Sequence, residues 1–272
     1  MLRVVTVATS GEGYFDYLVK SCKRHGIFLE VLGMGQKWQG FNWRTTILME
    51  YLENLPEHEL VCIVDAYDVI VTSNACEIMK RFWDMTAQHR VKIIAGCENP
   101  LNPMTKWFAR GIFGSCKNKL LNAGTYIGQV KHLKVFLQSM QQLSNDPKDD
   151  DQQLMTKICH KNPNMVHIDV ENELFLTLNS SFSKVHVPIV EKEIVLPSGA
   201  RPCILHANGS TRIDHVIRDL GYDVPGSFIR YMDLFTKDAL VKKITYYTKK
   251  IIRIPWFWVL ILFIFFFIMK FR

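Results

Sequence analysis

Short apolar runs alternate with amphipathic stretches along most of this chain. Residues 2–9 are rich in β-branched side chains and run into the turn Ser-Gly-Glu-Gly, which predicts a first strand followed by a turn. Tyr14, Leu18 and Cys22 then recur at helical spacing, and Gly26 is a stop signal for that helix. This alternation of strands and helices predicts an α/β fold.

The same alternation continues towards the C-terminus. Further strands are predicted at residues 27–34, 59–70 and 91–98, as a short strand at the start of 121–143, and within 165–179 and 187–206. Further helices are predicted at residues 43–55 and 75–89, over the rest of 121–143, and after a turn within 146–160. A basic amphipathic helix is predicted within residues 226–250.

The C-terminal residues have the pattern of a membrane anchor. From Ile254 to Met269 no residue is charged, and Lys or Arg residues flank the run on both sides. The run is shorter than the ~20 residues that span a bilayer, but snorkelling basic side chains at its ends could extend it. We expect a catalytic domain at 1–226, a juxtamembrane helix at 227–253 and a transmembrane anchor at 254–270. A buried core helix or a helix lying in the membrane plane is the alternative.

The formal net charge of +7 comes entirely from this end of the chain. From Lys237 onward there are eight Lys or Arg and one acidic residue, so residues 1–236 carry no formal net charge. This distribution favours an anionic membrane surface as a partner and gives no reason to expect nucleic acid.

The N-terminal residues lack the pattern of a signal peptide. We therefore expect a single-pass membrane protein whose catalytic domain faces the cytosol. Seven cysteines, odd in number and without metal-ligand spacing, are expected to be reduced and mostly buried.

Two carboxylates interrupt the apolar run of residues 59–70, at Asp65 and Asp68. Open α/β sheets bind ligands beyond the carboxyl ends of their strands. Mg²⁺ and Mn²⁺ prefer carboxylate oxygens, and such a cation offsets the charge of a nucleotide diphosphate. A sugar-nucleotide site is one interpretation, and a pair of solvated turn aspartates, one of them capping a helix, is the other.

A second polar cluster follows the apolar run that ends at His206, with Asn208 and Gly209 beside it. The imidazole could be a third ligand next to two carboxylates, or a hydrogen-bonded structural residue. Asn208 and Asn179 each begin a glycosylation sequon, which a cytosolic domain would leave unmodified.

Two further segments offer polar groups. The acidic run that includes Asp150 and Asp151 suits the start of a helix, but such carboxylates could also contact an acceptor hydroxyl or act as a base. Asn122 and Gly124 lie where a glycine would let the backbone approach a ligand closely, with a tight turn as the alternative.

Taken in order, seven segments resemble the glycosyltransferase domain of the procollagen lysyl hydroxylase (multifunctional lysyl hydroxylase/glycosyltransferase) family, over about residues 3 to 225. They are VVTVAT at 4–9, LGMGQKWQG at 32–40, VDAYDVI at 64–70, LNAGTYIG at 121–128, DDQQLMT at 150–156, HIDVENELFLTLN at 167–179 and LHANGSTR at 205–212.

The resemblance implies a GT-A type fold, a Rossmann-like mixed sheet flanked by helices, that uses a nucleotide-diphosphate sugar. It implies that Asp65, Asp68 and His206 hold Mn²⁺ or Mg²⁺, and that Asp150 and Asp151 are an essential acidic pair near the acceptor. The donor-binding residues that it implies are Thr6, Val7, Ala8, Thr9, Gly35, Trp38, Arg44, Asn122, Asn208 and Gly209.

The chain departs from the family pattern at two places. It is shorter before the helix expected near Trp43, where the family carries a phosphate-facing lysine, and Arg44 is the candidate replacement. The family's Cys-Trp-Pro segment is replaced by GCENPLNP at 96–103. These differences point to a different acceptor, and collagen in the secretory pathway does not fit the expected cytosol-facing domain.

The expected function is therefore transfer of a hexose, glucose or galactose, from a UDP-sugar to a hydroxyl acceptor on a protein, glycan or lipid at a membrane surface. A catalytically silent, membrane-tethered scaffold that binds sugar nucleotides or glycans is the first alternative. A metal-dependent phosphoester hydrolase is the second.

Overall fold

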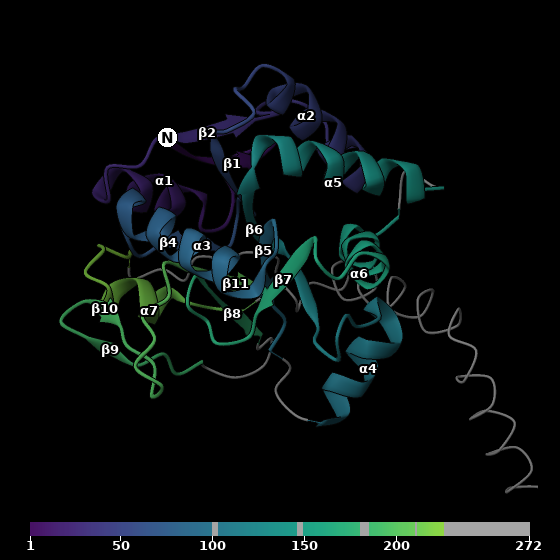
Figure 1. Ribbon diagram of the computed structural model, residues 1–272. Coiled ribbons are helices and arrows are strands. Elements are labelled where there is room, and N and C mark those ends of the chain that lie inside the picture. The colour runs from purple at the N-terminus through teal and green to yellow at the C-terminus, as the bar shows by residue number, and fades with distance from the viewer. Residues whose placement is uncertain (100–102, 146–148, 180–184, 210, 226–272) are drawn as a thin grey trace, which may run out of the picture.

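The centre of the fold is a six-stranded mixed sheet with the strand order β2-β1-β3-β6-β5-β7 (Figure 1). The computed structural model describes residues 1–99, 103–145, 149–179, 185–209 and 211–225. The strands of this sheet are β1 (Leu2–Val7), β2 (Leu29–Leu32), β3 (Leu60–Val64), β5 (Ile93–Cys97), β6 (Leu121–Gln129) and β7 (Val166–Asp169). Only β6 runs antiparallel to its neighbours, which confirms a mixed α/β fold built around a central sheet.

A smaller sheet with the order β4-β11-β8 lies next to the first. It contains β4 (Val69–Val71), β8 (Phe175–Asn179) and β11 (Ile204–Asn208). Strand β11 pairs in parallel with β8 and antiparallel with β4. A short hairpin of β9 (Ile189–Val190) and β10 (Glu193–Ile194) completes the strands of the described chain.

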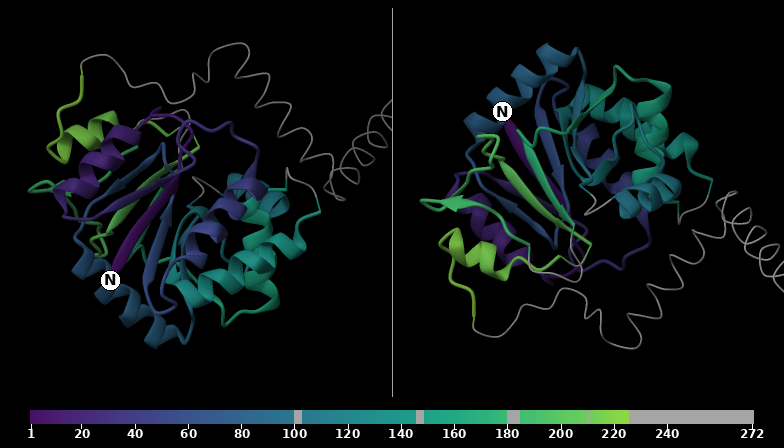
Figure 2. Two further views of the ribbon diagram at one scale, coloured as in Figure 1. Left: turned by 90° about the horizontal axis from the view of Figure 1, so that it is seen from above. Right: turned by 90° about the horizontal axis from the view of Figure 1, so that it is seen from below.

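Helices cover both faces of the central sheet, as the two views of Figure 2 show. One face packs against α2 (Phe41–Glu53), α5 (Val130–Leu143) and α6 (Asp151–Lys161), through side chains such as Leu52, Phe136 and Ile158. The other face packs against α1 (Phe15–Arg24) and α3 (Ala75–His89), through Leu18 and Phe82. These two apolar layers hold the sheet between them and fix the ends of its strands in space.

Two helices were not predicted from the sequence. They are α4 (Pro103–Phe113) and the short α7 (Asp214–Asp219). Strand β6 was expected to be short but has nine residues. It lies between β3 and β5 in the sheet and pairs with both. Its length follows from its central place, because it pairs along both of its edges.

The apolar run of residues 59–70 forms two strands in two sheets, and the prediction of one strand is wrong. Strand β3 ends at Val64, and β4 starts at Val69 beside β11 of the smaller sheet. The turn between them is held by two backbone hydrogen bonds: the N–H of Asp65 donates to the carbonyl of Gly124 at 2.8 Å, and the N–H of Ala207 donates to that of Asp68 at 2.7 Å. The two aspartates thus lie where one sheet passes into the other.

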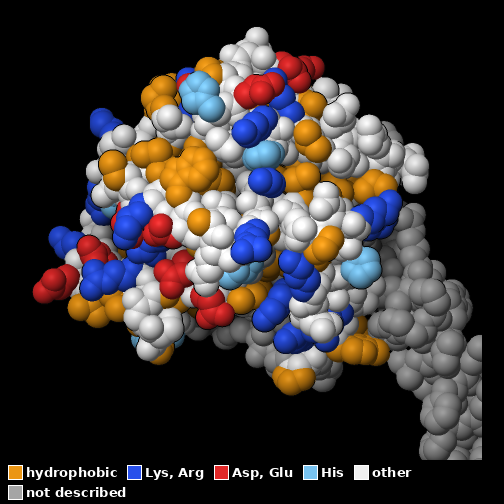
Figure 3. Space-filling model, viewed as in Figure 1, with side chains coloured by type: hydrophobic (Ala, Val, Ile, Leu, Met, Phe, Trp, Pro, Cys, Tyr) orange, Lys and Arg blue, Asp and Glu red, His pale blue; other side chains and the backbone are white. Residues whose placement is uncertain are grey.

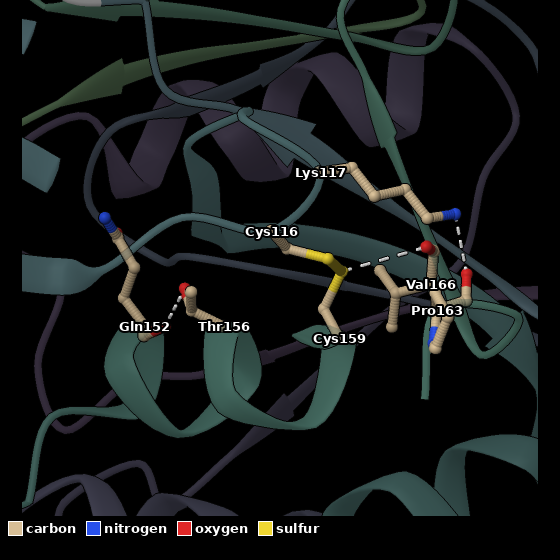
Figure 4. Close-up of a disulfide and its surroundings, with 7 residues drawn as sticks. All are labelled: Cys116, Lys117, Gln152, Thr156, Cys159, Pro163 and Val166. Atoms are coloured by element: carbon tan, nitrogen blue, oxygen red, sulfur yellow. Dashed lines mark hydrogen bonds between the residues drawn. A yellow bond between two sulfur atoms is a disulfide. The ribbon is translucent and has the colours of Figure 1, made fainter. Parts of the chain in front are cut away.

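Cys116 and Cys159 form a disulfide, so the expectation that every cysteine is reduced is wrong for this pair (Figure 4). Their Cα atoms lie 5.9 Å apart because the turn before β6 packs on α6. The pair is separated by 43 positions, and no local spacing announces it. Of the other cysteines, Cys76 is exposed and the remaining four are buried.

Acidic and basic side chains are mixed over the face shown in Figure 3, in keeping with the zero formal charge of residues 1–236. Among the described residues, no helix is long and apolar enough to cross a membrane. The predicted juxtamembrane helix at 227–253 and anchor at 254–270 lie outside the described residues, so both stay predictions.

Candidate active site

Asp65, Asp68 and His206 converge on one point at the junction of the two sheets. The aspartates occupy the turn between β3 and β4, and His206 lies on β11, which pairs with β4. One possible ligand atom from each residue lies within 4.8 Å of the others. Nε2 of His206 is 3.4 Å from Oδ1 of Asp68 and 3.7 Å from Oδ2 of Asp65. The structure thus brings together the three residues predicted to hold a metal.

The group formed by Asp65, Asp68 and His206 is buried on one side and accessible to solvent on the other. Asp68 and His206 are buried, whereas the side chain of Asp65 is 36% exposed. Burial raises the pKa of Asp68, partly offset by the nearby His206. Burial alone would lower the pKa of His206, but the carboxylate of Asp68 outweighs it, so that this pKa is raised.

Two atoms of the group are buried without a hydrogen-bond partner among the described residues. They are Oδ1 of Asp68 and Nε2 of His206, whose separation of 3.4 Å does not give a hydrogen bond. An unsatisfied buried polar atom is costly, and a cation coordinated by both would remove that cost. Carboxylate oxygens and an imidazole nitrogen together suit a divalent ion, so the residues present fit such an ion.

Gly124 on β6 leaves the space for this group. A Cβ atom at that position would lie 2.7 Å from Oδ2 of Asp65 and 2.8 Å from Nε2 of His206. Those separations are too short for nonbonded atoms in a packed interior, so a side chain there would push the two ligands away. The close packing of Asp65 and His206 against the backbone therefore requires this glycine, and the expected approach of the backbone to a ligand stays a prediction.

A buried glutamate, Glu98, supports the group from behind. Its carboxylate accepts hydrogen bonds from the side-chain amides of Asn122, Asn179 and Asn208, at 2.7 to 2.9 Å. Asn122 in turn lies 3.0 Å from Nδ1 of His206. The two sequon asparagines, Asn179 and Asn208, thus have their amides engaged inside the fold. Glu98 was not predicted from the sequence, where its only signal was its place as the last residue of a predicted strand.

Arg44 connects the group to helix α6. Its side chain is buried, with Nη2 2.8 Å from Oδ1 of Asp65 in an ion pair, while Nη1 donates a hydrogen bond to Oδ2 of Asp151 at 3.0 Å. Burial alone would lower the pKa of Arg44, but the two carboxylates raise it. The sequence analysis expected Arg44 to replace a phosphate-facing lysine, and in the structure its guanidinium faces carboxylates.

Asp150 and Asp151 have different roles at the start of α6. Oδ1 of Asp150 accepts from the backbone N–H of Gln153 at 3.1 Å, so Asp150 caps the helix. Burial raises the pKa of Asp151 to about 7, against the opposing effect of Arg44 and with help from Asp150 and Asp65. A carboxylate with this pKa can exchange protons near neutral pH.

The residues predicted to bind the nucleoside line the end of β1 and the loop after β2. Thr6, Val7 and Ala8 are buried, and the hydroxyl of Thr6 donates to the carbonyl of Val64 at 2.8 Å, so their side chains serve the core. The N–H of Thr9 donates to the hydroxyl of Tyr67 at 2.9 Å. Tyr67, which stands between the two aspartates, was missed by the sequence analysis although it lies inside the same motif.

The loop from Gly33 to Gly40 carries the remaining predicted donor residues. Gly35 has a φ of 77°, which favours glycine, and Trp38 is 45% exposed. The ring of Trp38 lies edge-on to those of Phe41 and Trp43, at centroid distances of 5.7 and 5.4 Å. Gly209, another predicted donor residue, directly follows β11 and has a φ of 78°.

Comparison with known proteins agrees with the resemblance seen in the sequence. A family model described as "PLOD GT domain" matches residues 1–228. The chain is 28% identical over 233 residues to the "Multifunctional procollagen lysine hydroxylase and glycosyltransferase" of Caenorhabditis elegans, covering 78% of this chain and 31% of that protein. It is 25% identical over 252 residues to the human "Multifunctional procollagen lysine hydroxylase and glycosyltransferase LH3", covering 84% and 32%.

This chain thus spans about a third of the length of the curated relatives that it matches. Among solved structures, it is similar to the "crystal structure of a glycosyltransferase involved in the glycosylation of the major capsid of PBCV-1", with a TM-score of 0.45 and 15% identity. That match covers 77% of this chain and 96% of the other.

Proposed function

We propose that this chain, which belongs to the PLOD GT domain family and is a glycosyltransferase, moves a hexose from a UDP-sugar to a hydroxyl acceptor. Glucose and galactose are the proposed sugars, and the acceptor is a protein, glycan or lipid. The observation that carries the proposal is the meeting of Asp65, Asp68 and His206 at a partly open junction of two sheets. We also propose that the mixed sheet and its helices are of the GT-A type.

Asp65, Asp68 and His206 are proposed to hold a divalent ion, Mn²⁺ or Mg²⁺. The buried, partnerless atoms of Asp68 and His206 support this assignment. When bound, such an ion supplies positive charge that stabilises the diphosphate as it leaves. Asn122, held by Glu98, contacts His206, and the missing side chain at Gly124 leaves room for Asp65 and His206.

The donor is proposed to bind along the loops that surround this group. Thr6, Val7, Ala8 and Thr9 would lie at its nucleoside end, together with Gly35 and the exposed ring of Trp38. Asn208 and Gly209 would lie at its diphosphate end, with Asn122 behind the metal ligands. The positive φ of Gly35 and Gly209 supports close approach of the backbone to a ligand at both ends.

Asp151 is proposed to take the proton from the acceptor hydroxyl. Its pKa of about 7 suits a general base near neutral pH. Arg44 holds one of its oxygens, and the backbone N–H of Gln152 donates to the other at 2.8 Å. Each carboxylate oxygen can accept a second hydrogen bond, so a hydroxyl can still reach Asp151. Asp150 supports this arrangement by capping α6.

We further propose that residues 254–270 anchor the protein in a membrane and that the catalytic domain faces the cytosol. The support for the anchor is the uncharged run with basic residues on both sides. An acceptor at or near the membrane surface would then be favoured by proximity alone.

The proposal is tested by measuring UDP release from a panel of UDP-sugars by the full chain with Mn²⁺. We expect turnover of UDP-glucose or UDP-galactose, and its loss in Asp65→Ala and His206→Ala. Asp84→Ala, which removes an exposed carboxylate on α3, is the control and should keep full activity. Turnover that survives both ligand substitutions would show that the metal assignment is wrong.

The same experiment separates the two alternatives. Binding of UDP with Mn²⁺ but no turnover of any UDP-sugar would favour a silent scaffold protein. Turnover of simple phosphoesters without any need for UDP would favour a hydrolase.

A further inference from the structure

Glu98 is a buried carboxylate whose hydrogen bonds come from three asparagine amides. It lies directly after β5 and is 4% exposed. Nδ2 of Asn122 donates to Oε2 at 2.9 Å, Nδ2 of Asn179 donates to Oε1 at 2.7 Å, and Nδ2 of Asn208 donates to both oxygens at 2.9 and 2.8 Å. Among the described residues, no Lys or Arg forms a salt bridge with it.

These hydrogen bonds fix the orientation of each amide. A carboxylate only accepts hydrogen bonds, so the NH₂ group of Asn122 must face Glu98 and its oxygen must face the other way. A second contact agrees, because the backbone N–H of Gly124 donates to Oδ1 of Asn122 at 2.9 Å. The side of Asn122 that faces away from Glu98 is therefore an acceptor.

His206 meets that acceptor. Nδ1 of His206 lies 3.0 Å from Oδ1 of Asn122, and two acceptors cannot share a hydrogen bond. Nδ1 must therefore carry the proton, and Nε2 of the neutral ring must carry the lone pair. Nε2 is the atom that lies 3.4 Å from Asp68 and 3.7 Å from Asp65 without a hydrogen-bond partner among the described residues.

The carboxylates of Asp65 and Asp68 by themselves favour the other tautomer of His206, with the proton on Nε2. A ring N–H directed at Asp65 or Asp68 would gain a charge-assisted hydrogen bond, so a histidine left to these neighbours would place its proton on Nε2. A proton there would occupy the position of a metal ion. Asn122 opposes this outcome from the other side of the ring.

We propose that Asn122, oriented by Glu98, is a positioning residue that selects the Nδ1–H tautomer of His206 and keeps Nε2 free to bind a divalent cation. This inference rests on the metal site of the proposed function and assigns a role to two residues behind it. Asn208 on β11 donates to both oxygens of Glu98 and so holds the carboxylate that orients Asn122 on β6. Hydrogen bonds behind a metal-binding histidine commonly fix its tautomer in this way.

The tautomer can be read from the ¹⁵N chemical shifts of the histidine rings in the metal-free full chain. The His206 signals are identified by their absence in His206→Gln. We expect the Nδ1–H pattern in the unsubstituted protein, at a pH high enough for the ring to be neutral. In Asn122→Ala the acceptor is lost, so the pattern should change to Nε2–H. In Asn122→Asp an oxygen still faces Nδ1, and the new carboxyl group can share one proton with Glu98, so the Nδ1–H pattern should return.

Mn²⁺ affinity, measured by calorimetry, is the second readout. It should fall by about 10- to 100-fold in Asn122→Ala, the range found when hydrogen bonds behind metal ligands are removed. Asn179→Ala is the matched control, because it removes a hydrogen bond from the same carboxylate but does not touch His206. Its tautomer and its Mn²⁺ affinity should both be unchanged.

Three results would overturn the proposal. One is an Nδ1–H pattern and unchanged Mn²⁺ affinity in Asn122→Ala. Another is the same tautomer change in Asn179→Ala, which would mean general loosening of the core. The third, which applies if Asn122→Ala does not fold, is an Nδ1–H pattern in Asn122→Leu, a variant of similar volume that has no acceptor for Nδ1.

Failure of this inference can be told apart from failure of the proposed function. If the unsubstituted protein bound no Mn²⁺, the proposed metal site would be wrong, whereas the ¹⁵N pattern would still report what Asn122 does to His206. If Mn²⁺ bound but no UDP-sugar turned over, the donor assignment would be wrong and the tautomer result would stand.

Discussion

Nη1 of Arg44 donates a hydrogen bond to Oδ2 of Asp151 at 3.0 Å. The other terminal nitrogen of the same guanidinium lies 2.8 Å from Asp65. One buried cation therefore joins the proposed base on α6 to a proposed metal ligand after β3. The charge of either carboxylate affects the other through Arg44, and this coupling makes Arg44 a sensitive position to test.

Arg44→Met should destabilise the protein strongly, because it leaves Asp65 and Asp151 without their buried partner. Removing one partner of a buried ion pair costs about 3–5 kcal/mol. Arg44 lowers the pKa of Asp151, so its removal should raise that pKa further and move the acid limb of the activity profile to higher pH. Denaturant unfolding and a pH–rate profile check the two effects.

The control for that substitution is Arg201→Met. Arg201 pairs with Glu193 at 2.6 Å, but both side chains are more than half exposed, so the loss should be at most about 1 kcal/mol. Equal losses of stability in the two variants would contradict the buried, coupled arrangement around Arg44.

Gly124→Ala should remove metal binding while leaving the rest of the fold in place. The new methyl group would lie 2.7 Å from Oδ2 of Asp65, so the ligand would have to move. We expect Mn²⁺ affinity to fall by at least about tenfold, with a matching loss of UDP-sugar turnover. Gly11→Ala is the control, because its Cβ would meet the nearest side chain, Phe15, at an ordinary 3.7 Å. Unchanged Mn²⁺ affinity in Gly124→Ala would place the metal elsewhere.

Reduction of the Cys116–Cys159 disulfide should lower the free energy of unfolding. The bond closes a loop of 43 residues, and bonds of this kind contribute about 2–4 kcal/mol. The double variant Cys116→Ser/Cys159→Ser should match the reduced protein, and Cys76→Ser, at an exposed free thiol, should have no effect. Thiol titration of the unreduced, denatured protein should find five free cysteines, and seven would contradict the disulfide.

Stability should fall on mild acidification because of His167. Its ring stacks on that of His89 at a centroid distance of 3.7 Å. Burial, together with the charges of His89, Lys117 and Lys119, lowers the pKa of His167 from 6.5 to about 4. Between these two pH values His167 is protonated in the unfolded chain but not in the folded chain. The free energy of unfolding therefore decreases as the pH falls through this window.

Unfolding free energies measured across that window should have a smaller pH slope in His167→Gln than in the unsubstituted protein. His160→Gln, at an exposed position, should keep the original slope. Equal slopes in all three proteins would contradict the lowered pKa of His167.

Local patterns were enough to predict several elements. Helix α3 was predicted at its observed bounds of residues 75–89, because apolar residues recur at helical spacing and Asn74 caps its start by accepting from the N–H of Glu77 at 3.0 Å. The family motifs also placed Asp65, Asp68 and His206 in one predicted site, which the structure brings together.

Other features depend on contacts that no local pattern encodes. Helix α4 is not one of these features, because Met104, Phe108 and Ile112 recur at helical spacing and the pattern was overlooked. The partners of Glu98 come from positions 24 to 110 residues away. Arg44 and Asp151 are separated by 107 positions, so their pairing shows only in the folded chain.

The run ELVCIVDAYDVI at residues 59–70 contains both features that the local sequence determines and features that depend on the tertiary structure. Its sequence by itself determined that the apolar residues would be buried as β-structure and that two aspartates would interrupt them, because apolar area and turn chemistry are local properties. Only the tertiary structure decided that Val64 ends a strand of one sheet and Val69 begins a strand of another. The second strand finds its partner in β11, more than 130 positions away, and that long-range pairing carries His206 to the two carboxylates.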